Sequence, residues 1–76
     1  MNLPPRFYRG DLPPREADLV RVKRALSRGP LTKRGLIEAT GLTQTRTFCT
    51  LDALIVRGEV SYDVSRREFL LQLPLT

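Results

Sequence analysis

The side chains able to do chemistry in this 76-residue sequence are basic and polar, and they lack the partners that catalysis needs. Histidine is absent and Cys49 is the only cysteine, which excludes the usual Cys/His zinc sites and an internal disulfide. No nucleophile has a neighbouring base, and no glycine-rich phosphate loop is present. We therefore expect a protein that is not an enzyme and that carries no cofactor and no metal.

Positive charge is the strongest chemical feature of the chain. Thirteen lysines and arginines face eight acidic residues, which gives a formal net charge of +5. Excess positive charge on a small domain attracts polyanions, and nucleic acid is the first candidate. A basic surface that only maintains solubility is the alternative interpretation of the same composition.

The densest set of polar side chains lies in a helix predicted over residues 43–57, which begins with Thr43 as its N-cap. A helix that enters the major groove of DNA must present polar groups in its first turns, where Arg46 could pair with a guanine and Gln44 with an adenine. The alternative for Arg46 is a phosphate contact or a solvated charge, and for Gln44 an ordinary surface position. The candidate DNA-contacting residues of this helix are Thr43, Gln44, Thr45, Arg46, Cys49 and Thr50.

Basic residues in two other segments could contact the phosphate backbone. Lys33 and Arg34 open a second predicted helix, and Arg66 and Arg67 lie at a predicted hairpin turn. Phosphate contacts position a protein on DNA without reading its sequence. Each of these residues alone could be a solvated charge, but the expected fold brings all four, together with Arg46, to one side.

Cys49 has two interpretations. On the outer face of the predicted helix it could act as a redox switch if Arg46 lowered the pKa of its thiol. The simpler interpretation, which we favour, is a small contact residue without a redox role.

Two helices are predicted upstream of these residues. The first covers about residues 15–28, with Leu19, Val22 and Leu26 in a core stripe and a Gly-Pro stop after it. The second covers residues 33–40, is capped by Thr32, and should bury Leu36 and Ile37 with Ala39 beside them.

The two ends of the chain have different patterns. Residues 1–14 are predicted to form an extended arm, because two Pro-Pro pairs restrict the backbone there. After residue 58, apolar and polar residues alternate on both sides of a short polar stretch at about 64–66, which predicts a β-hairpin. Residues 15–76 are therefore predicted to form one domain of the α+β class.

The stretch from Leu31 to Val60 resembles the winged-helix bacterial regulators of the MarR and ArsR kinds. The residues that carry this resemblance are Leu31-Thr32, Leu36-Ile37, Gly41-Leu42-Thr43, Leu51, Leu54 and Gly58-Glu59-Val60. The resemblance implies a winged helix-turn-helix fold, with three helices followed by a C-terminal β-hairpin wing, in which helix 43–57 enters the major groove.

The sequence departs from that family at several points. Thr40 and Thr47 stand where larger apolar residues are usual, and Phe48 stands where a small polar residue is common. The family usually dimerises through helices outside the wing, and none is predicted here. We therefore expect any homodimer to form only on DNA.

The function expected from these features is sequence-specific binding of double-stranded DNA by a small transcriptional regulator. The alternative is a winged-helix protein-protein interaction module in an assembly or regulatory complex, with Phe7 and Tyr8 of the N-terminal arm and an exposed Val56 as its contact surface. RNA is a weaker candidate, since the sequence lacks the aromatic pairs that stack on unpaired bases. With neither an apolar membrane span nor a signal core, the expected location is cytoplasmic, with no membrane partner.

Overall fold

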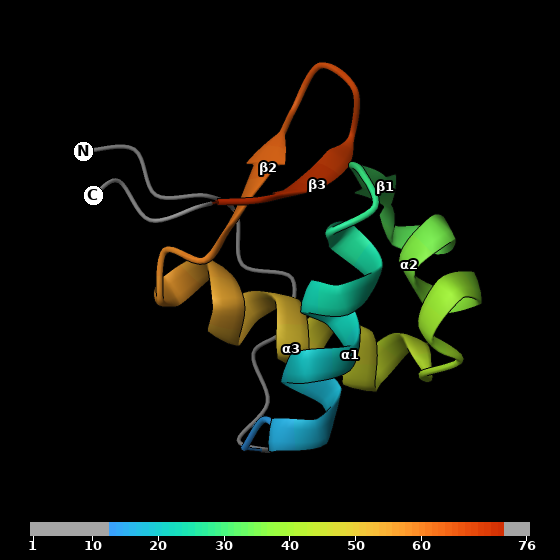
Figure 1. Cartoon of the computed structure of the whole chain (residues 1–76), viewed down its shortest axis with the longest axis vertical. Helices are drawn as coiled ribbons and strands as arrows, with labels where there is room; N and C mark the ends of the chain where they lie inside the picture. Colours follow the sequence, from blue (N-terminus) through green and yellow to red (C-terminus); the bar gives the residue numbers. More distant parts are fainter. Residues whose placement is uncertain (1–12, 73–76) are drawn as a thin grey trace.

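The computed structural model describes residues 13–72, which form three helices and a three-stranded antiparallel sheet (Figure 1). The elements follow in the order α1 (Glu16–Leu26), β1 (Leu31–Thr32), α2 (Lys33–Thr40), α3 (Gln44–Val56), β2 (Val60–Asp63) and β3 (Glu68–Leu71). The predicted α+β class is confirmed. Most of the predicted arm, with Phe7 and Tyr8, lies outside the described residues. No helix within residues 13–72 is long and apolar enough to cross a membrane.

Helix α1 turns its predicted apolar stripe into the core. Leu19, Val22 and Leu26 are each at most 3% exposed. The helix ends at Leu26, earlier than the predicted end near Arg28. A tight turn follows, in which the Gly29 amide donates to the Leu26 carbonyl at 3.1 Å. Such a turn satisfies a carbonyl that has no partner inside the helix.

Helices α2 and α3 begin and end at the predicted signals. The hydroxyl of Thr32 accepts a hydrogen bond from the Gly35 amide at 3.1 Å, and the hydroxyl of Thr43 accepts one from the Arg46 amide at 3.1 Å. These side chains cap amides that the helices leave unpaired. Gly41 ends α2 in the left-handed region, with a φ of 74°, where a side chain would be strained. Only three residues therefore separate the two helices.

The sheet has the strand order β1-β3-β2, and its strands β2 and β3 form the predicted hairpin. The turn covers residues 64–67, one more than predicted, and Arg67 has a positive φ of 55°. A carboxylate oxygen of Asp63 accepts from the amides of Ser65 and Arg66 at 3.0 and 3.3 Å, which holds the start of the turn.

Strand β1 was not predicted, because two residues carry no periodic signal. It pairs with β3, with Leu31 opposite Phe69, and so ties the start of α2 to the hairpin. The short distance between β1 and the first turn of α2 also explains why position 35 is a glycine. A Cβ there would lie 3.3 Å from the Thr32 hydroxyl and 3.4 Å from a methyl group of Leu31.

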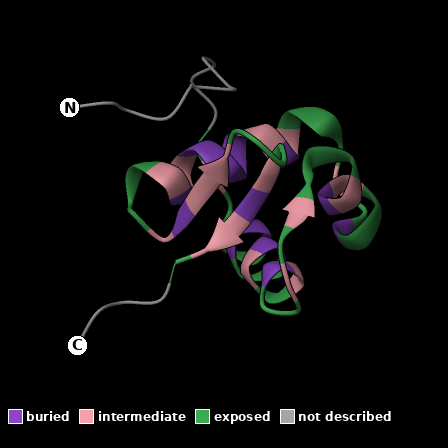
Figure 2. Cartoon of the chain, turned by 90° about the horizontal axis from the view of Figure 1, so that it is seen from above, coloured by how far each residue is buried: buried purple, intermediate pink, exposed green. Residues whose placement is uncertain are grey.

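The core lies where the three helices meet the sheet (Figure 2). Thr40 and Thr47 are buried in it, and their hydroxyls donate to the carbonyls four residues earlier at 2.6 and 2.8 Å. A threonine can therefore replace an apolar residue there without leaving a buried hydroxyl unpaired. Ile37 is half-buried, as is Phe48, and Ala39 is exposed, so the prediction that Ala39 adjoins the core is wrong.

Candidate nucleic-acid interface

The start of α3 presents polar side chains to solvent. Thr43, Gln44 and Thr45 are exposed, as the prediction for a groove-facing helix requires. Thr43 already uses its hydroxyl as the N-cap of the helix. Gln44 and Thr45 therefore remain as the side chains of the first turn that could hydrogen-bond to base edges or phosphates.

Arg46 points elsewhere. Its Nη2 lies 3.3 Å from a carboxylate oxygen of Asp18 on α1, and the two side chains are only 19% and 11% exposed. Nη2 makes no well-aligned hydrogen bond, so the contact with Asp18 is an ion pair without good hydrogen-bond geometry. A helical wheel drawn for residues 43–57 alone places Arg46 on the outer face of the helix, but the buried carboxylate of Asp18 on the neighbouring α1 attracts its guanidinium. Arg46 thus links α3 to α1, with its guanidinium turned toward Asp18, and its contact with a DNA base stays a prediction.

Cys49 and Thr50 are also removed from the surface. Cys49 is 4% exposed and Thr50 is 1% exposed, with the Thr50 hydroxyl donating to the Arg46 carbonyl at 2.8 Å. Burial is the main influence on the Cys49 thiol and raises its pKa, while Arg46 lowers the pKa to a lesser degree. Asp52 and Asp18 add to the increase. The outer-face placement of Cys49 is therefore wrong, and Thr50 is too deeply buried to reach DNA from this position. A buried thiol of raised pKa is a poor redox switch.

The hairpin and the start of α2 enclose a basic pocket of about 400 Å³. Lys33, Arg34 and Arg67 all line this pocket, and all three side chains are exposed. Three of the four predicted phosphate-contacting residues thus converge. Arg66 is exposed in the adjoining turn but does not line the pocket. Strand β1 accounts for this convergence, because it fixes the start of α2 against β3.

Aromatic residues support this basic pocket. Tyr62 and Phe69 form its inner wall, with ring centroids 4.8 Å apart and planes tilted by 46°. Phe69 is 1% exposed, so it is part of the core rather than a stacking platform. The Lys33 ammonium lies 5.5 Å from the centre of the Phe48 ring on α3, within the range of a cation–π interaction. Phe48 therefore connects the start of α2 with α3.

Sequence reasoning missed two features of this region. The cation–π contact of Lys33 with Phe48 spans two elements, and neither residue type alone signals it. The Asp18–Arg46 pair had one available signal, since Asp18 lies next to Leu19 and four residues before Val22, at the edge of the core stripe. An acidic residue at such a position requires a buried partner.

Residues 13–72 contain no cluster of three or more His, Cys, Asp and Glu side chains able to hold a metal ion. Comparison with models of protein families, with curated proteins and with solved structures finds no match to this chain.

Proposed function

We propose that the chain is a winged helix-turn-helix domain that binds double-stranded DNA in a sequence-dependent way, as a small transcriptional regulator. In this proposal α3 enters the major groove, and the hairpin between β2 and β3 is the wing. The short connection between α2 and α3 supports the proposal, because a tight turn between two such helices is the defining feature of the motif.

The observation that carries the proposal is the convergence of Lys33, Arg34 and Arg67 on one pocket between the start of α2 and the hairpin. Lys33 also lies 5.5 Å from the ring of Phe48 on α3. In this proposal the start of α2 and the wing approach the phosphate backbone beside the groove that holds α3. Positive side chains at both places would neutralise phosphates and release counterions. The net charge of +5 acts in the same direction.

The roles within α3 differ from those that the sequence indicates. Gln44 is the best candidate for reading a base, because it is exposed in the first turn and its amide can pair with adenine. Thr45 is the second candidate. Arg46 has a positioning role, since its contact with Asp18 fixes α3 against α1.

Selection of bound fragments from a random duplex pool tests the proposal. We expect the wild-type protein to enrich a sequence motif, and Gln44→Ala to relax the preference at one position of that motif. Lys33→Ala and Arg67→Ala should weaken binding to all sequences alike, because phosphate contacts carry no sequence information. Retention of no duplex by the wild type at roughly 50 mM salt, where phosphate-dependent binding is strong, would contradict the proposal.

A protein-protein interaction module is the second candidate, and exposed apolar side chains favour it. Val56 at the end of α3 is 68% exposed, and Val64 in the hairpin turn is 72% exposed. Scattered surface valines are common in proteins without partners, so this support is weaker. A partner whose binding survives Lys33→Ala and Arg67→Ala but is lost with Val56→Asp would favour the module over the regulator.

A further inference from the structure

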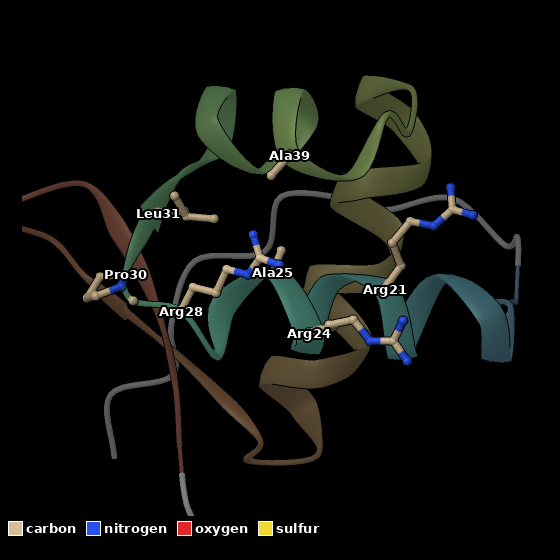
Figure 3. A pocket seen from close by; sticks show the side chains of 8 residues that line it. Arg21, Arg24, Ala25, Arg28, Pro30, Leu31 and Ala39 are labelled. Carbon is tan, nitrogen blue, oxygen red and sulfur yellow. The ribbon is translucent and has the colours of Figure 1, made fainter.

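A second basic surface lies in the groove between α1 and α2 (Figure 3). It contains a pocket of about 330 Å³ lined by residues of α1, of the connection to β1, of β1 and of α2. No residue of α3, β2 or β3 contributes to the lining. The pocket shares no lining residue with the pocket of Lys33, Arg34 and Arg67, and the proposed DNA contacts do not account for it.

Two arginines of α1 and one from the turn after it border this pocket. Arg21 and Arg24 lie three residues apart and so share a face of α1, and Arg28 follows in the turn after Leu26. Arg21 is held at one end, where its Nη1 donates to the Thr40 carbonyl at 3.3 Å. Figure 3 shows Arg28 at the other end, below Leu31.

The charge of these arginines is uncompensated within the part of the chain that the structure describes. All three side chains are exposed, none of them forms an ion pair with an acidic side chain of residues 13–72, and no acidic residue lines the pocket. Guanidinium groups bind carboxylates through paired, charge-assisted hydrogen bonds. The surface is thus complementary to a ligand with several carboxylates.

The floor of the pocket is apolar, and this feature distinguishes between the two classes of polyanion that could bind there, DNA and an acidic peptide. Ala25, Pro30, Leu31 and Ala39 supply it. A DNA backbone could place phosphates on the arginines, but its only aliphatic carbons are those of the sugar ring and its 5′ methylene, and it has no aliphatic side chain that could project onto this floor. An acidic peptide segment can do both, because an apolar side chain between two acidic residues enters the pocket while its neighbours meet the arginines.

We infer that the groove between α1 and α2 binds an acidic segment of a partner protein. One aliphatic side chain of that segment sits against Leu31 and Ala39, and flanking Asp or Glu side chains pair with Arg21, Arg24 and Arg28. The chain would then carry two basic surfaces with different ligands, one for DNA and one for an acidic protein segment.

Fluorescence anisotropy of a labelled short peptide tests this inference on the full chain. The probe carries one leucine flanked by glutamates, and the control probes replace the glutamates with lysines or the leucine with glycine. We expect binding of the first probe only. Each Arg→Ala substitution at 21, 24 or 28 should weaken binding about threefold, as exposed ion pairs do, and the triple variant roughly thirtyfold.

Two further variants make the result specific to the pocket. Ala39→Glu places a carboxylate at the floor and should abolish peptide binding, while glutamate is well tolerated in a helix. Arg57→Ala removes an exposed arginine outside the pocket and should leave peptide binding within about twofold, since remote exposed charges interact weakly. Circular dichroism melts confirm that each variant folds.

Three outcomes would overturn the inference. The first is no binding of the acidic peptide by the wild type. The second is a loss in the triple variant no larger than that in Arg57→Ala, which would indicate general charge attraction. The third is an unchanged peptide affinity together with weaker binding of a labelled DNA duplex by the triple variant, which would assign the groove to DNA. Because the duplex is measured separately, failure of this inference is distinguishable from failure of the DNA-binding proposal.

Discussion

Removal of the Asp18 carboxylate should destabilise the protein more than removal of any exposed acidic group. In Asp18→Asn the Arg46 guanidinium, whose side chain is 19% exposed, keeps its charge and loses its partner at 3.3 Å. Breaking a fully buried pair in this way costs about 3–5 kcal/mol, and an exposed pair contributes about 1 kcal/mol or less. With side chains 11% and 19% exposed, we expect a loss of about 2 kcal/mol of unfolding free energy.

Thermal and urea denaturation followed by circular dichroism measure this loss. In a domain of this size about 1 kcal/mol shifts the Tm by about 4–8 °C, so Asp18→Asn should lower it by roughly 8–16 °C. The matched control is Glu16→Gln, which removes an exposed carboxylate from the same first turn of α1. Both substitutions remove a favourable interaction with the helix dipole, worth about 0.5 kcal/mol, so the difference between them isolates the ion pair.

A double-variant cycle identifies the partner. Arg46→Met keeps most of the apolar stem and removes the charge, so Asp18→Asn combined with Arg46→Met should cost at least about 1 kcal/mol less than the sum of the single losses. The assigned link between α1 and α3 is refuted if Asp18→Asn is no more destabilising than Glu16→Gln. It is also refuted if the loss of unfolding free energy in the double variant equals the sum of the losses in the two single variants. Arg46 would then be available for the DNA contact that the sequence indicates.

Three other predictions concern the caps of the helices and the buried thiol. Thr43→Ala removes the N-cap of α3 and should lower the unfolding free energy by about 1 kcal/mol in urea titrations, whereas the neighbouring Thr45→Ala should change it little. Gly41→Ala puts a side chain at a φ of 74° and should cost about 1–2 kcal/mol, with Gly41→Asn less damaging in the same assay. Because burial raises the Cys49 pKa above its ordinary value of 9.0, the unfolded chain ionises first, and the stability that the neutral thiol provides should be lost as the pH rises above that value. Cys49→Ala should show a smaller decline in urea midpoint over this range, and an equal decline in both proteins would refute the assigned burial.

The helices and the hairpin could be predicted because their signals are local. Thr32 and Thr43 cap the helices that follow them, and Gly41 ends α2 where a left-handed residue is needed. Alternation on both sides of the turn revealed β2 and β3. Strand β1 could not be predicted, since its two residues become a strand only through pairing with β3.

The candidate site was predictable only in part, because the burial of a side chain depends on neighbouring elements that the helical wheel of a single helix does not include. Lys33, Arg34 and Arg67 converge as expected, although the strand β1 that holds the start of α2 against β3 was not predicted. Arg46 and Cys49 were assigned to the outer face of α3. In the structure Asp18 on α1 attracts Arg46, and Cys49 is buried. Such tertiary contacts between charged residues leave little trace in sequence periodicity.

The salt dependence of duplex binding tests the central claim most directly. Each phosphate contact contributes about 0.9 to the slope of log affinity against log salt, so changing Lys33, Arg34 and Arg67 together to alanine should reduce that slope by roughly 2.7. Arg24→Ala, which removes an exposed arginine on the separate α1 surface, should leave the slope unchanged. A triple variant with the wild-type slope, or a wild-type protein without duplex binding, would contradict the account of this surface as a DNA interface.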